Sequence, residues 1–512
     1  MIDVLLIYPS LGSMDMLICD LPLSVIYVAT DAVKQGRNVK IIDLRVVEGD
    51  WRIPIRAALA EGVRLAGLSV MTGLPLKSAR EVALFIRESS PSTRIVYGGP
   101  HVTVLPETIE EPYIDFLVRG EGSRALAQLL GHLCGDDIPL ENISSISYKN
   151  AAGPVHNPRT PSFEKLDWQD IPYHLVDMRS PRYMRTYNQH RMFPIFSSLG
   201  CPYQCTYCVH PAIYRAINGA KWVPFTEESI IGHIQMAMQK YDARHIVFMD
   251  DTPFPNLERM RRLLNLIVEK CPGVTLEFRG ARVDEVDRMD DAFLELLIKA
   301  GARFIQVGAE SGSNRVLKNF DKRITREDIL RVSRKLLRFP AITVHYNFFY
   351  GTPGETYKDL LETKTLILQL LRENPNSYLS FGGDWKPVPG SKMLDQAIEF
   401  YGYKMPKTID DWIEIDSVDA KEKIVHPWYT RKHNNLIKLL QMAAFVIDDK
   451  LIKESKGNNS PFYLLIRFLA HIYKPINAFR LRYNLHQCMF EYELWWQLMK
   501  FLVWIKKKNV KA

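Results

Sequence analysis

Ser198-Leu-Gly-Cys201-Pro-Tyr-Gln-Cys205-Thr-Tyr-Cys208 is the stretch on which the prediction of fold and chemistry depends. Its three cysteines are spaced C-x3-C-x2-C and follow the apolar run from Met192 to Phe196. This pattern predicts a strand that ends in a cysteine-rich loop. Three thiolates on one such loop could hold a metal cluster and leave one of its metal atoms without a protein ligand.

Three other uses of these cysteines compete with a cluster. Buried structural cysteines are common, but three within eight residues fit scattered placement poorly in a chain with seven cysteines. Cys201, Cys205, Cys208 and His210 could form a Cys3His zinc site, although structural zinc modules usually use two separated ligand pairs and the sequence has no second pair. A redox pair of Cys205 and Cys208 leaves Cys201 unused. The pattern therefore favours an iron–sulfur cluster.

The same stretch resembles the signature of the radical S-adenosylmethionine (SAM) enzymes, in which an aromatic residue, here Tyr207, precedes the last cysteine. The resemblance implies that Cys201, Cys205 and Cys208 ligate three irons of a 4Fe-4S cluster and that the fourth iron chelates SAM. It also implies an external low-potential electron donor of the flavodoxin or ferredoxin type. Its electron would break the sulfonium bond and leave a 5'-deoxyadenosyl radical.

Length and composition limit the number of domains and the class of protein. The chain has 512 residues, 47% hydrophobic and 24% charged, which is enough for two to four globular domains. Four of the seven cysteines are widely separated singles, which favours a reducing compartment over a disulfide framework. The N-terminus reads as a first strand, and no uninterrupted apolar run is long enough for a membrane span. We therefore expect a cytoplasmic enzyme.

Residues 1–140 show a regular alternation of strand and helix patterns. Apolar runs lie at 3–8, 39–42, 65–70, 94–97 and 114–118, and stretches of helical period lie at 22–35, 51–61, 75–88, 102–109 and 122–133. The alternation predicts a doubly wound parallel sheet, with its ligand outside the carboxyl ends of the strands.

Glycine-rich steps follow three of these predicted strands. They are Ser69-Val-Met-Thr72-Gly73, Gly98-Gly99-Pro100-His101 and Arg119-Gly120-Glu121-Gly122. Small residues allow close backbone approach, and the N–H groups of the following helices could donate to a ligand that carries phosphate or amide groups. Each glycine alone could simply end its strand.

Together the three steps resemble the cobalamin-binding domain that precedes many radical SAM enzymes. The resemblance implies cobalamin contacts at Ser69, Thr72, Gly98, Gly99, Gly120 and Glu121. A D-x-H-x-x-G motif, whose histidine would reach cobalt, does not occur in the sequence, and the only histidines of this region are His101 and His132. The resemblance then implies a base-off cobalamin whose lower face meets side chains or water. Some members of the family keep the fold without binding cobalamin.

Residues 141–190 hold five prolines and read as a linker, with a hairpin-like pair around Tyr148 and Val155. Residues 191–395 then repeat a strand–helix unit six times, which predicts an open, partial (β/α)6 barrel with its chemistry at the carboxyl ends of the strands. The predicted strands are 192–198, 245–249, 274–281, 303–308, 342–349 and 377–384, and the predicted helices are 226–240, 256–270, 289–300, 325–338 and 355–372.

Polar residues and glycines stand at the ends of these strands. Carboxylates could receive the amino group and ribose hydroxyls of SAM, and glycines could let adenine lie on bare backbone. Acidic pairs at strand ends also serve as helix caps. The resemblance favours Glu310 and Ser311 as SAM contacts, and Pro387-Val-Pro-Gly-Ser391 matches a P-x-P-G-[ST] step of the cobalamin-type subfamily. The candidate SAM contacts are Tyr207, Asp250, Asp251, Arg282, Glu310, Ser311 and Gly354.

Residues 396–512 read as helical, with helices predicted at 429–449, 461–471 and 486–507. Residues 461–512 hold nine Lys or Arg against two Glu, and this surplus accounts for most of the net charge of +8. Trp495, Trp496 and Trp504 lie in the same stretch. A helical cap on the barrel is one interpretation, and an interfacial segment on an anionic membrane, at the inner face, is another. The pattern does not favour nucleic acid as a partner.

The sequence predicts an enzyme, a cobalamin-dependent radical SAM methyltransferase acting on a small-molecule or lipid substrate. The resemblance implies that one SAM methylates the cobalamin and a second yields the radical that activates an unactivated carbon for methylation. The first alternative is an anaerobic cyclase or oxidase, or a lipid-modifying relative. The second is an inactive cofactor-binding or membrane-binding protein, against which the intact cysteine triplet argues.

Overall fold

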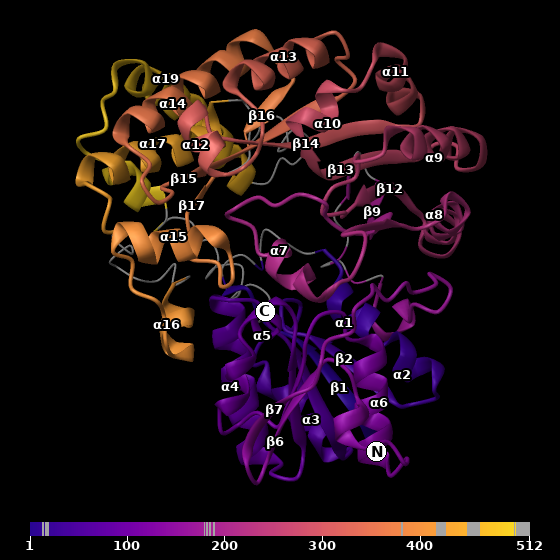
Figure 1. Ribbon diagram of the computed structural model, residues 1–512. Helices are drawn as coiled ribbons and strands as arrows, with labels where there is room; N and C mark the ends of the chain where they lie inside the picture. Colours follow the sequence, from indigo (N-terminus) through magenta and orange to yellow (C-terminus); the bar gives the residue numbers. More distant parts are fainter. Residues whose placement is uncertain are drawn as a thin grey trace.

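The computed structural model of the protein describes residues 1–497 except 13–14, 16–19, 179, 181–182, 184–185, 188–189, 380–381, 416–425, 448–460 and 496. Within these ranges the chain forms two sheets, each with helices around it, and a group of helices beside the second sheet (Figure 1). This arrangement confirms the expected fold class. None of the described helices is both long and apolar enough to cross a membrane.

The first sheet has the strand order β2-β1-β3-β4-β5-β6-β7, and its first five strands run parallel. Alternate side chains of β1 belong to two separate cores: Val4 and Leu6 pack with α1, α2 and α6, whereas Leu5 and Ile7 pack with α3 and α4. The sheet is therefore covered on both faces, as its apolar strands require. The elements are β1 Ile2–Tyr8, α1 Leu23–Val28, α2 Thr30–Lys34, β2 Val39–Asp43, α3 Arg52–Ala60, β3 Val63–Ser69, α4 Leu74–Ser89, β4 Arg94–Gly98, α5 Pro100–Val104, β5 Phe116–Val118 and α6 Ser123–Cys134.

Two details of this half differ from the sequence expectation. The predicted helix at 102–109 is the short helix α5 followed by a 3-10 turn, Pro106–Glu110, because Pro106 has no N–H to continue an α-helix. The expected hairpin pairs Tyr148 with Val155. Its strands, β6 Ile146–Asn150 and β7 Gly153–His156, extend the first sheet because β6 pairs antiparallel with β5. This part of the predicted linker is therefore sheet.

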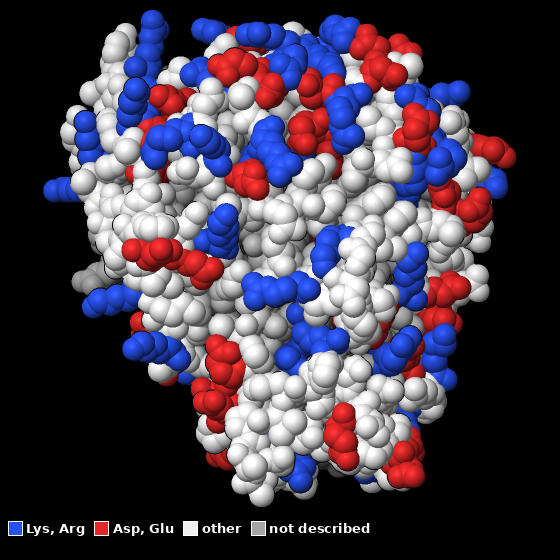
Figure 2. All heavy atoms as spheres, viewed as in Figure 1, with Lys and Arg blue, Asp and Glu red and all other residues white. Residues whose placement is uncertain are grey.

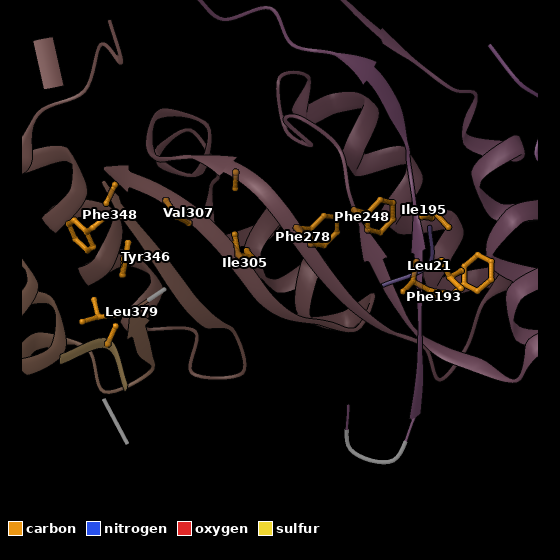
Figure 3. Close-up of a cluster of buried hydrophobic side chains, with 14 of the residues drawn as sticks. Leu21, Phe193, Ile195, Phe248, Phe278, Ile305, Val307, Tyr346, Phe348 and Leu379 are labelled. Atoms are coloured by element: carbon orange, nitrogen blue, oxygen red, sulfur yellow. The ribbon is translucent and has the colours of Figure 1, made fainter. Parts of the chain in front are cut away.

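The second sheet places six parallel strands side by side in chain order, from β9 to β16, and remains open. Its strands are β8 Thr186–Tyr187, β9 His190–Ile195, β12 Ala243–Phe248, β13 Thr275–Arg282, β14 Ala302–Glu310, β15 Thr343–Tyr350, β16 Ser377–Leu379 and β17 Gly383–Asp384. Figure 3 shows one buried apolar layer contributed by neighbouring strands, from Phe193 through Phe248, Phe278 and Ile305 to Tyr346. This layer packs the strands against the outer helices and holds the strand ends in place.

The outer helices of this half match the predicted spans closely. They are α8 Glu227–Tyr241, α9 Leu257–Lys270, α10 Val283–Asp287, α11 Asp291–Lys299, α12 Asn314–Asn319, α13 Arg326–Leu337 and α14 Tyr357–Glu373. The first strand is shorter than the predicted 192–198. It ends at Ile195, and a second strand, β10 Ser198–Gly200, turns away to pair antiparallel with β11 Trp222–Pro224. The short helix α7 His210–Ile213 follows the cysteines and lies between the two sheets in Figure 1.

Helices α15 Lys392–Tyr401, α16 Ile409–Glu414, α17 Arg431–Val446 and α19 Pro461–Tyr483 follow the second sheet. Helix α16 returns to the first half, where it packs on α4 and Arg80 pairs with Asp410. The helix predicted at 461–471 continues through Pro475 to Tyr483. His471, whose carbonyl loses its helical donor at Pro475, is exposed and can be hydrated. Of the helix predicted at 486–507, residues 486–489 are not helical, helical structure begins at Phe490, and residues 496 and 498–507 lie outside the described residues.

Candidate functional site

The three motif cysteines lie on one loop, residues 201–208, which we call the cysteine loop. Gly200 precedes this loop and has a positive φ of 80°. An added Cβ at Gly200 would lie 2.2 Å from the carbonyl oxygen of Lys221, so the close pairing of β10 with β11 requires glycine here. The N–H of Thr206 donates to the carbonyl of Phe320, which fastens the loop to the end of helix α12. All three cysteines are free and half-buried.

The thiols fit the chemistry of a cluster better than that of a single ion. Burial raises the pKa of Cys201 and of Cys208 to about 12, so a bound cation must drive their deprotonation. Zinc binds sulfur at about 2.3 Å, which would require the donors to lie within about 4 Å of one another. No three His, Cys, Asp or Glu side chains of the described residues are arranged to hold one ion, and Cys201, Cys205, Cys208 and His210 are all described. A 4Fe-4S cluster binds each cysteine to a different iron, so it does not require three sulfurs around one ion.

Two N–H groups point at the sulfurs. Arg282, at the end of β13, lies with Nη1 3.3 Å from Cys205 Sγ, and the backbone N–H of His210 donates to Cys208 Sγ at 3.4 Å. Arg282 is fixed from other sides, since Nη2 donates to the carbonyl of Lys322 and the guanidinium lies 3.8 Å from the centre of the Tyr203 ring. Such donors are among the features that set the potential of an iron–sulfur cluster.

Glu310 and Tyr207 are brought together beside the loop. The hydroxyl of Tyr207 donates to Glu310 Oε1 at 3.0 Å, and Lys322 Nζ pairs with the same oxygen at 3.0 Å. Glu310 has a positive φ of 65°, a strained value for a residue with a side chain. An added Cβ at Gly308 would lie 2.3 Å from Glu310 Oε1, so this glycine makes room for the carboxylate.

The two aspartates after β12 face different surroundings. The buried carboxylate of Asp250 accepts hydrogen bonds from the backbone N–H and hydroxyl of Ser197 and from the hydroxyl of Ser198. Burial raises its pKa to about 6. Asp251 is more open: Oδ2 accepts from the Tyr214 hydroxyl at 2.7 Å and lies 3.4 Å from Nδ1 of His210. Asp251 is therefore the member of the pair that faces the cysteine loop.

Ser311 lies beneath the surface of the site, whereas Gly354 is half-buried. Ser311 is fully buried, with its hydroxyl 3.1 Å from that of Thr363 on α14. Gly354 has a positive φ of 73°, and an added Cβ would lie 2.3 Å from the Tyr401 hydroxyl. The structure thus gathers Tyr207, Arg282, Glu310 and Asp251 around the cysteines, while Asp250 and Ser311 make their contacts within the protein.

A cavity of about 350 Å³ lies outside the carboxyl ends of the strands of the first sheet. Five of the residues predicted for cobalamin line it: Ser69, Gly98, Gly99, Gly120 and Glu121. Burial raises the pKa of Glu121 to about 7. The sixth, Thr72, does not line the cavity, and its hydroxyl lies 3.0 Å from Nδ1 of the buried His101. The residues that line this cavity in the described part of the chain include no histidine.

The opposite wall of the cavity comes from the region around the cysteine loop and includes Phe163, Phe196, Leu199, Tyr214 and Phe225. This wall is mostly apolar and suits the face of a large ring. Tyr214 belongs both to this wall and, through its hydroxyl, to the group around Asp251. The cavity and the cysteine loop therefore share one side chain as a common boundary.

Sequence reasoning missed four residues that shape the site. Thr103 accepts from the N–H of Gly120 and donates to the carbonyl of Gly99, so it ties two glycine steps together. Tyr214, Lys322 and Arg159 lie in stretches without a motif. Only the spacing of Thr103, one turn after Gly99, offered a signal in the sequence.

Comparison with known proteins agrees with this geometry. The chain matches the radical SAM superfamily model over residues 195–367 and the B12 binding domain model over residues 21–130. It is 24% identical to an uncharacterized methyltransferase of Pyrococcus horikoshii, over 85% of this chain and 89% of the relative. The cytidylyl-2-hydroxyethylphosphonate methyltransferase of Streptomyces wedmorensis is 22% identical over 77% of this chain and 81% of its own length.

A cyclase also stands among the relatives. The anaerobic magnesium-protoporphyrin IX monomethyl ester cyclase of a Synechocystis species is 27% identical over 47% of this chain and 46% of its own length, about half of each protein. The solved structure of the radical SAM methyltransferase TsrM from Kitasatospora setae has a TM-score of 0.62 at 21% identity, covering 79% of this chain and 80% of that one. That of the cobalamin-dependent enzyme OxsB has a TM-score of 0.68 at 17% identity, covering 99% and 75%. Both share the fold. The chain therefore joins a B12 binding domain to a radical SAM domain, and these two domains imply a 4Fe-4S cluster, SAM and cobalamin as cofactors.

Proposed function

We propose that this enzyme methylates an unactivated carbon of a small-molecule substrate. One observation carries the proposal: Tyr214 forms part of the cavity wall and also donates to Asp251, which lies beside His210 and the cysteine loop. The cavity proposed for cobalamin and the residues beside the cysteine loop thus share one side chain. This proximity suits chemistry in which both cofactors act on one carbon.

We assign the cluster to Cys201, Cys205 and Cys208. For SAM we propose contacts with Tyr207, Asp251, Arg282, Glu310 and the backbone at Gly354, with Asp250 and Ser311 supporting them from below. For cobalamin we propose contacts with Ser69, Gly98, Gly99, Gly120 and Glu121, with Thr72 acting through His101. We further propose domain bounds at 1–140, 141–190, 191–395 and 396–512, with the hairpin β6–β7 as an extension of the first domain.

When bound, these cofactors supply hydrogen abstraction from carbon and a methyl group for transfer. The side chains of the protein position and shield them. Tyr207 and Lys322 hold the Glu310 carboxylate in one orientation, ready to accept a hydrogen bond from an amino or hydroxyl group. The aromatic wall at Phe163, Phe196 and Phe225 keeps water from the cavity, which protects a reactive intermediate.

Anaerobic turnover with SAM that carries a deuterated methyl group tests this proposal. The substrate pool is an extract of a strain that lacks the gene, and untargeted mass spectrometry compares the wild type with the Cys201→Ala variant. We expect a product heavier by one labelled methyl group only with the wild type. A new product without label, formed by loss of hydrogen or gain of oxygen, would instead show cyclase or oxidase chemistry.

Radical SAM chemistry requires a reductant, and we propose a flavodoxin or ferredoxin. Figure 2 shows several basic side chains near the centre of the displayed face, at the level of α7 in Figure 1, with acidic side chains toward either edge. Helix α7 directly follows the cysteine loop. Because flavodoxins and ferredoxins are acidic, this face is where we expect the donor to approach.

Helix α19 turns its apolar face outward, which supports a membrane surface as a further partner. Among the residues of α19 whose side chains the structure describes, the buried ones are Ala470, Asn477 and Leu481, and the first two are small or polar. The exposed apolar side chains recur at helical spacing and form one stripe: Leu464, Leu465, Phe468, Leu469, Ile472, Ile476, Phe479 and Tyr483. A contiguous exposed apolar surface of this kind marks an interaction site.

This stripe is held on the body of the protein. Lys364 on α14 donates to the carbonyl of Leu481 at 3.1 Å and to Asn484 Oδ1 at 2.6 Å, and Arg480 pairs with Glu491. We propose that the stripe docks on an anionic lipid surface. The nine basic residues against two acidic ones in 461–512 complement such a surface. The enzyme would then be cytoplasmic and peripheral on the inner membrane face.

Vesicle co-sedimentation of the full chain tests the docking. We expect binding to anionic vesicles that weakens with salt and is lost in the variant Phe468→Ser/Ile472→Ser/Phe479→Ser. The matched control, Ile53→Ser/Leu84→Ser/Phe400→Ser, removes equally exposed apolar groups elsewhere and should still bind. A wild type that stays in solution, or that forms a dimer which only the α19 variant loses, would show that lipid does not cover the stripe.

A further inference from the structure

Two arginines border the cobalamin cavity without an ionic partner. Arg119 follows β5, and Arg159 follows the hairpin β6–β7, in the segment predicted as linker. No carboxylate of the described residues lies within 4.0 Å of either guanidinium group. Arg119 Nη2 donates to the carbonyls of Ile146 and Asn157, and Arg159 Nη2 donates to that of Ile213. Both Nε atoms are buried and have no hydrogen-bond acceptor within the described part of the chain.

No negative charge among the described residues compensates the positive charges of Arg119 and Arg159. Burial, with repulsion from Arg159, lowers the pKa of Arg119 to about 10, and burial also lowers the pKa of Arg159. Among the other buried arginines of the described residues, Arg45 pairs with Asp43 and Arg282 with Asp284. Within the described part of the chain Arg259 has no ion pair but is influenced by the charges of Asp250 and Glu227, whereas no carboxylate acts on Arg119 or Arg159 in this way. Two unpaired positive charges at one buried wall are unfavourable unless a ligand brings a negative charge.

The acidic residues of the cavity do not neutralise the pair. Glu121 accepts a hydrogen bond from the backbone N–H of Glu164 and is influenced by the charge of that residue. Glu164 in turn interacts with Arg124 and Asp31. Neither carboxylate is among the charges that act on Arg119 or Arg159, so the two arginines can receive an anion.

The chemistry of the ligand indicates which anion this is. The side chains of the corrin ring of cobalamin are neutral amides, and its nucleotide arm carries a single phosphodiester. Guanidinium groups bind phosphate oxygens in a forked geometry. The hydroxyls of Ser145 and Thr160 line the same part of the cavity, and an apolar recess at Leu6, Val96 and Leu126 could take the base of the arm.

We propose that Arg119 and Arg159 bind the phosphodiester of cobalamin, so that the segment after β7 forms part of the cobalamin site. The backbone is shaped for this contact: Gly120 has a positive φ of 83°, and an added Cβ would lie 3.1 Å from Arg159 Nη2. The inference rests on the proposed placement of cobalamin in this cavity.

Binding of two corrinoids to the anaerobically reconstituted full chain tests it. Hydroxocobalamin carries the phosphodiester, and cobinamide lacks the whole nucleotide arm. We expect Arg159→Gln to weaken hydroxocobalamin binding about tenfold or more, since a hydrogen bond to a charged group is lost, and to leave cobinamide binding unchanged. Arg159→Lys should bind with intermediate affinity, and Arg124→Gln, which removes an exposed arginine from α6, should match the wild type.

Each other outcome overturns the inference in a distinct way. Equal loss of both corrinoids in Arg159→Gln would mean that the arginine contacts the corrin ring or only supports the fold. Unchanged affinity for both would mean that the anion belongs to another ligand. A wild type that binds neither corrinoid would overturn the placement of cobalamin itself.

Discussion

Arg282 illustrates what a motif predicts and what it leaves open. Its position after a strand made it a candidate SAM contact, but its guanidinium group lies 3.3 Å from Cys205 Sγ. The cysteines and Tyr207 could be predicted because their spacing along one loop is itself the signal. Lys322 and Tyr214 could not be predicted, because they join the site only through tertiary contacts, with Glu310 and with Asp251 respectively. The residues next to each of them in the sequence do not predict such long-range contacts.

The contact of Arg282 with Cys205 leads to a prediction about redox potential. A positive donor near a thiolate stabilises the reduced cluster, so Arg282→Met should shift the midpoint potential of the reconstituted cluster downward by tens of millivolts. A tenfold change in a one-electron equilibrium corresponds to about 59 mV. Redox titration followed by electron paramagnetic resonance measures the shift.

Two further variants separate a local contact from a change in net charge. Arg279→Met removes an arginine from the same strand that pairs with Glu277 and Asp20, and it should leave the potential close to that of the wild type. Arg282→Lys keeps the positive charge, and its midpoint potential should lie between those of the wild type and Arg282→Met. Equal shifts in Arg279→Met and Arg282→Met would show that the contact with Cys205 has no specific role.

At the level of elements, most strands and helices follow from hydrophobic periodicity. The exceptions have physical causes. Strand β9 ends at Ile195 because Ser197 and Ser198 turn inward to bind the Asp250 carboxylate, a contact made across the sheet. The sequence predicts the hairpin β6–β7 around Tyr148 and Val155, but it does not predict the pairing with β5 that makes this hairpin part of the first sheet. Tertiary pairing determines such short strands.

The turn between β15 and α14 carries a pH-dependent contact. Glu355 is fully buried and closes the turn by accepting from the backbone N–H groups of Gly351 and Thr352. Burial raises its pKa from the usual 4.5 to about 8, so the folded state favours the protonated form. The associated stability is present below about pH 4.5 and is lost as the pH rises toward 8.

We therefore expect Glu355→Gln to raise the unfolding temperature of the protein near pH 8.5 and to change it little near pH 5. The gain is at most a few kcal/mol, since each pKa unit corresponds to about 1.4 kcal/mol. Thermal unfolding at both pH values measures it, with the exposed Glu258→Gln as the control. If the difference between Glu355→Gln and wild type is the same at both pH values, the buried carboxyl does not titrate as described.

At the scale of the whole molecule, the first sheet and the cysteine loop face each other across one cavity. The order of the halves and the type of each sheet could be predicted, because each follows from local repeats of strand and helix. The shared wall at Tyr214 could not, because it depends on how the halves pack. The sequence also could not predict that the apolar face of α19 points outward, because periodicity shows that a helix is amphipathic without showing which side is buried.

The central claim is that the cysteine loop holds a cluster that cleaves SAM. Its most direct test is anaerobic reconstitution with iron and sulfide, followed by measurement of bound iron and of 5'-deoxyadenosine formed from SAM under a strong reductant. The wild type should hold about four irons per chain and form 5'-deoxyadenosine, and the variant Cys201→Ala/Cys205→Ala/Cys208→Ala should do neither. Tightly bound zinc without iron in the wild type, or SAM cleavage by the triple variant, would contradict the claim.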